Sequence, residues 1–360
     1  MSERDQRDQS ADSLRADRDG REEHVVQAGS VVGSPGRAQG DTGGLTAGAA
    51  SIGVPEYADT ADTALAYESG VATKARSQWA YARIRFFRHR LAVASLIVLI
   101  GIAFVGLFAN RIAPYGFDEI NLDDITSPPT RDGHHWFGTD QLGRDYLSRV
   151  IYGIRTSLWV AVFVAFLSTA IGTVIGAVAG YYGGQVDNLL MRFTDLILTL
   201  PGLAVLLTAA AFLGSGDPLK VGIILALLFW TGIARIVRGV FLSLREKEFV
   251  EAAKASGAGD ARIMFRHMLP NSLGPIIVNT TLIIAAAILV EAALSFLGFG
   301  IQPPNAALGK LIADGQGEGF DLWWLVTFPG LTIVVIALAI NFIGDGLRDA
   351  LDPTQRRVRA

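Results

Sequence analysis

The chain has 360 residues, of which 51% are hydrophobic, and its formal net charge is only -3. It contains no cysteine, which excludes a disulfide framework, a thiolate metal site and a cysteine nucleophile. The first part of the chain has almost no apolar run, whereas several uncharged stretches of about 20 residues occur from Leu91 onward. Such stretches are long enough to cross a bilayer, so the composition predicts an all-α integral membrane protein.

Residues 1–73 are predicted to be a disordered cytoplasmic tail, because they are rich in Asp, Arg, Gly, Ser and Ala and show no sustained periodicity. A docking or regulatory arm is the alternative interpretation of this composition. The first apolar segment begins only near Leu91, too late for a cleaved signal peptide, and is expected to remain as an anchor.

Residues 74–90 combine basic and aromatic side chains, which is typical of a helix that lies at the cytoplasmic membrane interface and contacts lipid. A nucleic-acid-binding patch has a similar composition. The apolar span that follows directly favours membrane lipid as the partner and no nucleic acid.

Six membrane spans are predicted from the apolar runs. They cover Leu91–Phe108, Ser157–Gly180, Ile197–Leu213, Val221–Val240, Leu273–Leu297 and Leu322–Ile343. Basic residues precede the first span and follow the fourth and the sixth, whereas the loops after the first and the fifth are acidic. The positive-inside rule therefore places both termini in the cytoplasm.

The spans divide the chain into successive regions. We expect a first transmembrane anchor at 91–108, an extracytoplasmic loop at 109–156, a core of five spans at 157–347 and a cytoplasmic tail at 348–360. The core contains a cytoplasmic loop at 245–271.

Small residues recur every four positions along the second span, which predicts close packing against another helix. They are Ser168, Gly172, Gly176, Gly180 and Gly184. Pro201 and Pro329 each precede a glycine inside a span, so a kink is expected at both. Trp323 and Trp324 stand at the outward start of the last span and are predicted to anchor it at headgroup level.

The loop after the fourth span is too long to be a simple turn. Residues 249–255 favour a first short helix, which Gly257 can end. Asp260 is expected to cap a second helix through Met268, before Pro270 starts the fifth span. The sequence thus predicts a pair of short helices that lie across the membrane surface.

The residues of this loop carry a resemblance to a known family. The loop resembles the cytoplasmic coupling loop of ABC importer permeases in the order and spacing of Glu251-Ala252-Ala253, Gly257 and Leu269-Pro270. A histidine at the position of His267 is similar to the peptide branch of that family. The resemblance implies a type I importer permease fold in which Glu251, Ala252, Ala253, Gly257, His267, Leu269 and Pro270 couple to an ATPase.

A second set of segments is similar to the C-type subunits of dipeptide and oligopeptide permeases. These segments are His135–Gly153, Glu291–Gly298, Gln302–Pro304 and Gly344–Pro353. The similarity spans roughly 83–353. It implies a prokaryotic plasma (inner) membrane protein that forms half of a peptide pathway.

The same resemblance implies the partners. They are a second homologous permease subunit, ATP-binding subunits or a fused ATPase, and an extracytoplasmic peptide-binding protein. No cofactor is expected on this chain, and ATP and magnesium would bind to the partner. Consistently, the only Gly-Lys pair, Gly309-Lys310, lacks the upstream glycine of a phosphate-binding loop.

Charged residues inside spans cost about 2.5–3.5 kcal/mol at mid-bilayer, which makes Glu291, Asp195 and Arg235 candidates for the substrate pathway. Glu291 lies near the outer end of its span, where an interfacial structural role competes with recognition of a peptide amine. Asp195 is expected to pair with Arg192 or Arg235, or to face the cytoplasm. Arg235 lies near the cytoplasmic end of its span, where its head can snorkel inward.

No metal site is expected, because the imidazoles of His134 and His135 point apart in an extended segment. Two alternatives to a peptide importer stay open. One is a permease for nickel or another non-peptide cargo, and the other is a membrane carrier or scaffold that is not coupled to ATP.

Overall fold

The structure is a computed structural model that describes residues 78–130, 135–214, 216–319 and 321–351. The predicted tail at 1–73, the start of the predicted interfacial helix at 74–77, and the end of the C-terminal tail at 352–360 lie outside the described residues.

Five of the described helices are long and apolar enough to cross a membrane. They are α4 (Arg90–Leu107), α6 (Tyr146–Tyr182), α9 (Pro218–Arg245), α12 (Leu269–Phe296) and α14 (Trp324–Leu351). The bent pair of α7 (Gly184–Thr199) and α8 (Gly202–Leu213) makes a sixth span when it is counted as one. This arrangement confirms the predicted all-α membrane fold.

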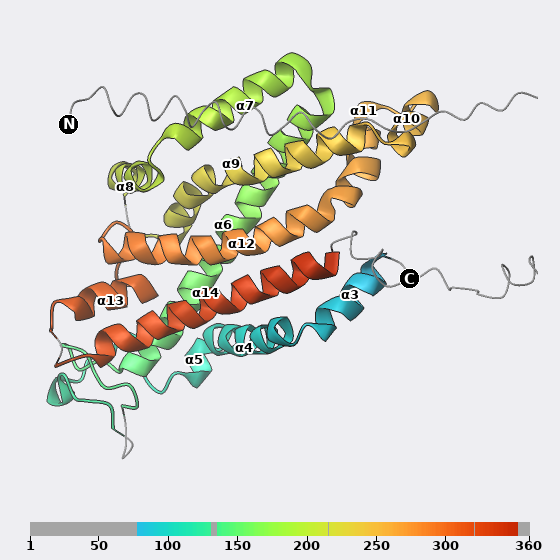
Figure 1. The fold of residues 1–360 in the computed structure, drawn as a ribbon. Coiled ribbons are helices and arrows are strands. Elements are labelled where there is room, and N and C mark those ends of the chain that lie inside the picture. The colour runs from blue at the N-terminus through green and yellow to red at the C-terminus, as the bar shows by residue number, and fades with distance from the viewer. Residues whose placement is uncertain (1–77, 131–134, 215, 320, 352–360) are drawn as a thin grey trace, which may run out of the picture. The chain divides into compact units, whose positions relative to one another are not determined.

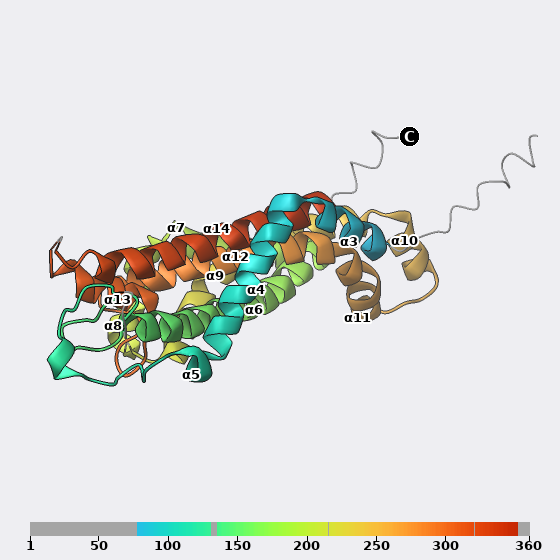
Figure 2. The same cartoon turned by 90° about the horizontal axis from the view of Figure 1, so that it is seen from below.

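Shorter elements lie at the two ends of the spans. At one end Figures 1 and 2 show α3 (Gln78–Arg88), α10 (Glu248–Ala255) and α11 (Asp260–Arg262), and at the other end they show α8 and α13 (Leu308–Gln316). We call the first the basic end, because it carries Arg83, Arg88, Arg90, Lys247, Lys254, Arg262, Arg266 and Arg348. We call the second the acidic end, after Asp118, Glu119, Asp123, Asp124, Asp314 and Glu318.

The stripe of small residues joins α6 to α9, as the sequence predicts. A Cβ at Gly172 would lie 2.6 Å from the carbonyl oxygen of Trp230, and one at Gly180 would lie 2.7 Å from that of Arg238. The Ser168 hydroxyl donates a hydrogen bond to the carbonyl of Ala226 at 3.3 Å. The expected fifth member differs, because Gly184 lies beyond α6 and has no atom near its Cβ position.

The third span is broken where a kink is predicted. α7 ends at Thr199 and α8 begins at Gly202, and the two helices meet at 85°. Leu200 adopts an extended conformation before Pro201, which the ring of that proline enforces on the preceding residue. The span predicted at Ile197–Leu213 is therefore two helices that meet at the expected kink, and the first of them begins earlier, at Gly184. By contrast, α14 continues through Pro329, so the helix is not interrupted there.

The second span starts earlier than predicted, at Tyr146 rather than at Ser157. Asp145 caps it, because one carboxylate oxygen accepts the Ser148 amide at 2.8 Å while the other lies 2.9 Å from Nδ1 of His135. The end of the loop predicted at 109–156 is therefore the first part of α6.

Buried polar contacts hold residues 140–145, which precede α6, against the first turns of that helix, and they also join α6 to α14. The Asp140 carboxylate accepts from Nη1 of Arg149 at 2.5 Å and from Nε of Arg144 at 2.8 Å. The Tyr146 hydroxyl donates to the carbonyl of Leu325 at 2.5 Å. These bonds link the start of α6 to the start of α14.

Trp324 belongs to the same cluster and does not anchor the span at headgroup level. Its indole nitrogen donates to the carbonyl of Thr139 at 3.3 Å, and the side chain is only 4% exposed. Trp323, by contrast, is 51% exposed, and its anchoring at headgroup level stays a prediction.

Candidate functional site

The loop at the basic end begins with α10, whose end has a complete capping motif. Gly257 follows the helix with φ +77°, and its amide donates to the carbonyl of Lys254 at 2.9 Å. The amide of Ala258 donates to the carbonyl of Ala253 at 3.1 Å. This pair of bonds is the Schellman motif, which needs a left-handed residue at the position that Gly257 occupies.

The second part of the loop is not a separate helix. α11 begins after Gly259 and continues through a π-helical segment, η2 (Ile263–Met268), directly into α12. Asp260 was expected to cap this helix, but its side chain makes no cap hydrogen bond. The second part of the loop and α12 therefore form one continuous helical run from Asp260 to Phe296.

Three buried side chains fix the loop to the rest of the protein. Val250 of α10 and Met268 of η2 are fully buried, and Ile263 is 1% exposed. All three belong to the main hydrophobic core, which also contains Phe241 of α9 and Tyr181 of α6. The loop is thus anchored by apolar packing.

Tyr181, at the end of α6, joins the two halves of the loop. Its hydroxyl donates to Oδ1 of Asp260 at 2.7 Å, and the ammonium of Lys254 lies 5.8 Å from the centre of its ring. Nη1 of Arg245 donates to its carbonyl at 3.3 Å. Tyr181 could not be identified from the sequence, because all of these partners lie far away along the chain.

The predicted coupling residues lie along this loop but differ in orientation. Glu251, Ala252, Gly257 and Pro270 are exposed, whereas Ala253, His267 and Leu269 are half-buried. Ala253 and Leu269 pack against the core of this chain. Only part of the predicted residue set is therefore exposed for contact with a partner, namely Glu251, Ala252, Gly257 and Pro270.

Two aromatic side chains add to that surface and were not predicted. Phe249 of α10 is 40% exposed and Phe265 of η2 is 63% exposed. Their signal in the sequence is an aromatic side chain next to a charged one, with Glu248 before Phe249 and Arg266 after Phe265. Aromatic side chains, phenylalanine included, are enriched at protein interfaces.

The predicted pathway residues do not form one site. Nη2 of Arg235 on α9 lies 2.5 Å from Oδ1 of Asp195 on α7, and both side chains are more than half exposed. Arg238, one turn further along α9, binds both carboxylate oxygens of Asp187. Of the partners expected for Asp195, the structure therefore shows Arg235, and both arginines of α9 pair with carboxylates of α7.

Glu291 lies elsewhere and is fully buried, not interfacial. Its carboxylate accepts from the hydroxyl of Ser157 on α6 at 2.8 Å and from that of Ser295 at 2.7 Å. The Ser295 oxygen in turn accepts from the amide of Ile301 at 3.0 Å. Glu291 thus ties α12 to α6 and positions the loop that follows α12.

Among the described residues, no group of three or more His, Asp or Glu side chains is arranged to hold a metal ion. His135 is buried against Asp145, and its ring lies 5.1 Å from that of Tyr115. Partial burial and the Asp145 carboxylate raise the pKa of Tyr115. These contacts give His135 a structural role, while His134 lies outside the described residues.

Comparison with known proteins gives two family matches. The family described as binding-protein-dependent transport system inner membrane component matches residues 172–357. The family described as N-terminal TM domain of oligopeptide transport permease C matches residues 77–129.

Individual relatives align over most of the chain. The oligopeptide transport system permease protein OppC of Escherichia coli K12 is 43% identical over 281 residues, which cover 78% of this chain and 93% of the relative. OppC of Mycobacterium tuberculosis H37Rv is 41% identical over 277 residues, covering 76% and 94%. A putative peptide permease protein of Brucella suis is 45% identical over 273 residues, covering 75% and 89%.

Proposed function

Because the chain belongs to the family of binding-protein-dependent transport system inner membrane components, we propose that it forms half of the pathway of an ATP-driven oligopeptide importer. The observation that carries the peptide cargo is the identity of 41–43% to oligopeptide permeases over more than nine tenths of their length. The chain is a permease subunit of the plasma (inner) membrane and hydrolyses no ATP itself.

The exposed part of the basic-end loop is the proposed contact with the ATPase. Glu251 and Ala252 offer one charge beside a small side chain, and Phe249 and Phe265 offer apolar rings. Anchoring through Val250 and Met268 supports a rigid connection to α9 and α12. ATP and magnesium would bind to the ATP-binding subunits or a fused ATPase, and this loop would receive the resulting movement.

The face of α7 and α9 is the proposed side of the pathway. The Asp195–Arg235 pair is exposed there, next to exposed apolar side chains such as Phe193 and Leu196. An exposed ion pair on helices that cross a membrane requires a polar partner or water. A second homologous permease subunit would provide both at a shared pathway. Because Glu291 is buried, its proposed role is to position α6, α12 and the following loop, without contact to the cargo.

The acidic end is the proposed docking side for an extracytoplasmic peptide-binding protein, and the basic end is proposed to be cytoplasmic. The even number of crossings, with α7 and α8 counted as one, brings α3 and the end of α14 to the same side (Figure 1). Both termini would then be cytoplasmic.

A topology reporter tests this orientation. A reporter that is active only outside the cytoplasm should be inactive when fused after Ala360, and active when inserted at 131–134 in the loop after α4. The physical reason is the excess of arginine and lysine at the basic end. Activity after Ala360 would contradict the orientation, and the internal insertion controls for a reporter that fails to fold.

Uptake by the purified complex in liposomes tests the cargo. Entry of a labelled oligopeptide should require ATP, the ATPase and the binding protein together. Uptake without ATP would favour a secondary carrier, and ATP-dependent uptake of nickel without peptide would favour the alternative cargo. Either result would overturn the proposed peptide importer.

A further inference from the structure

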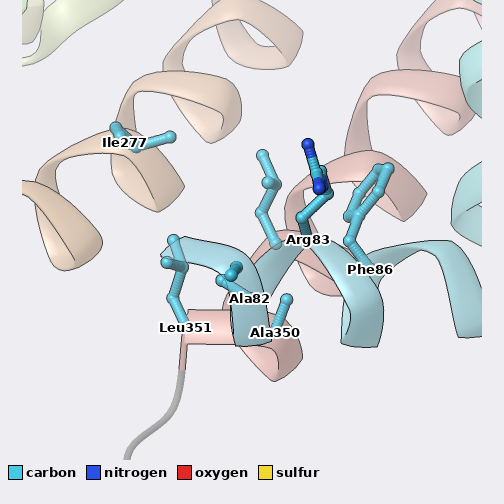
Figure 3. Close-up of a pocket in the computed structure, with 8 residues that line it drawn as sticks. Ala82, Arg83, Phe86, Ile277, Ala350 and Leu351 are labelled. Atoms are coloured by element: carbon cyan, nitrogen blue, oxygen red, sulfur yellow. The ribbon is translucent and has the colours of Figure 1, made fainter. Parts of the chain in front are cut away.

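A cavity of about 590 Å³ lies at the basic end, between α3, α12 and α14. Its volume falls within the range of about 300–1,000 Å³ that is usual for small-molecule sites. It is lined by Ala80, Ala82, Arg83, Phe86, Ile277, Leu347, Ala350 and Leu351. Figure 3 shows Ile277 of α12 on one side and Arg83 and Phe86 of α3 on the other.

Helix α14 packs against both of the other walls of this cavity, α3 and α12. Phe86 and Ala350 belong to a small buried cluster that holds α3 against α14. Ile277 stands across the gap on α12 and belongs to neither of these helices. The cavity is therefore a preformed space whose α12 wall would gain contacts if a ligand filled it.

The cavity combines an apolar lining with one charge. Of the eight lining residues within the part of the chain that the structure describes, seven have apolar side chains and the eighth is Arg83, with its guanidinium. Arg83 is exposed and forms no ion pair within the part of the chain that the structure describes. Among the described residues no carboxylate lines the cavity, so its electrostatic complement is an anion with an apolar portion.

The position of the cavity identifies the source of such an anion. Ile84, Phe87 and Leu91 are exposed apolar residues at spacings of three and four along α3 and the start of α4. Arg88 and Arg90 lie between them. This is the pattern of a helix at the membrane interface, where headgroups and the upper part of acyl chains are both within reach.

We propose that this cavity binds one anionic glycerophospholipid, with its phosphate at Arg83 and part of an acyl chain between α3, α12 and α14. The lipid would bridge α3 to α12. The proposal is independent of the cargo, and rests on the lining of the cavity, on the charge of Arg83 and on the interfacial pattern of α3.

Selection of this lipid over the surrounding bilayer would come from its headgroup. Lipid tails are as apolar as the cavity wall, so moving an acyl chain from the bilayer into the cavity gains little hydrophobic free energy. An arginine near an anionic headgroup contributes about 1 kcal/mol. Removing Arg83 should therefore weaken binding of an anionic lipid about fivefold, the factor that corresponds to this energy.

Native mass spectrometry of the purified complex tests the site. The complex is titrated with phosphatidylglycerol or with zwitterionic phosphatidylcholine, and the bound lipid is counted for the unaltered chain, Arg83→Ala and Arg88→Ala. Arg88 is the matched control, because it is an exposed arginine on the same helix that does not line the cavity. We expect preferential binding of phosphatidylglycerol, a loss of about fivefold in Arg83→Ala and no such loss in Arg88→Ala.

Ile277→Trp tests the acyl portion, because a larger side chain fills the cavity and should prevent binding of both lipids. Ile277→Ala, which leaves the space open, should preserve binding and controls for a general defect at this position. Equal losses in the two arginine variants, or unchanged binding in Ile277→Trp, would overturn the site. So would equally tight binding of soluble glycerol phosphate, which lacks an acyl chain. Lipid binding seen only after deletion of residues 1–73 would show that the N-terminal segment occupies the cavity instead.

Discussion

Replacing Glu251 with lysine is expected to abolish ATP-driven uptake while the chain still folds and inserts. Glu251 is exposed on the first turn of α10 and forms no ion pair within the described residues. Reversing its charge should therefore cost the chain only about 0.3–1 kcal/mol, through the helix dipole. A buried charged contact with a partner costs about 2 kcal/mol or more when it is lost, so retention of the ATPase should fall at least about thirtyfold.

The measurements are uptake and substrate-stimulated ATP hydrolysis by the complex in liposomes, together with the amount of ATPase retained on the permease. Glu248→Lys is the matched control, since Glu248 is exposed on the same turn and its reversal changes the net charge and the dipole equally. Unchanged coupling and retention in Glu251→Lys would remove the loop from the mechanism. A loss of equal size in Glu248→Lys would mean that overall charge matters and Glu251 itself does not.

Gly257 provides a second variant of the same loop with a different physical basis. No atom of the described residues lies within 4 Å of its Cβ position, so a Cβ there meets no steric obstacle among them. The cost is conformational, about 1–2 kcal/mol for a left-handed residue at φ +77°. Gly257→Val should therefore loosen the end of α10 and abolish uptake, and Gly257→Asn should retain more activity because asparagine tolerates this conformation. Equal activity in both variants would contradict the geometric role of the turn.

Features that depend on residues close together along the chain could be predicted from the sequence. The left-handed turn at Gly257 follows from a glycine at the end of a short helical pattern, and the close approach of some other helix to α6 follows from glycines spaced four apart, although the sequence did not identify that helix as α9. The break near Pro201 was predicted as a kink, but its angle of 85° was not, because the angle depends on how α7 packs against α9.

Contacts between distant segments could not be predicted. Counting residues along its helix placed Glu291 near the membrane interface. In the structure it is fully buried, and it accepts a hydrogen bond from Ser157, which lies 134 residues earlier in the chain. Trp324 is a residue type that commonly anchors a span at headgroup level, but here it is buried and donates a hydrogen bond to Thr139 in the loop before α6. In both cases the side chain is typical of a membrane surface, and only the tertiary partner shows that it is internal.

Replacing Gly176 with leucine is expected to prevent the complex from folding. A Cβ at this position would overlap the carbonyl oxygen of Ala234 on α9, and it would lie 2.9 Å from Cβ of Val237. The carbonyl belongs to a continuous helix and cannot rotate away, so the two helices would have to separate. Overpacking a buried site typically costs about 1–3 kcal/mol, and a clash with backbone should reach about 3 kcal/mol or more.

The measurement is the yield of monodisperse complex after detergent extraction, with its thermal midpoint. Gly101→Leu on α4 is the control, since Gly101 is an exposed helical glycine with no atom within 4 Å of its Cβ position. It adds the same side chain to a membrane-spanning helix, and should leave the yield unchanged because leucine favours helix more than glycine does. If Gly176→Leu gave the yield and midpoint of Gly101→Leu, α6 and α9 would not be packed through the glycine stripe. Gly176→Ala should fall between the two, because its Cβ alone already overlaps the carbonyl while the rest of the leucine side chain is missing.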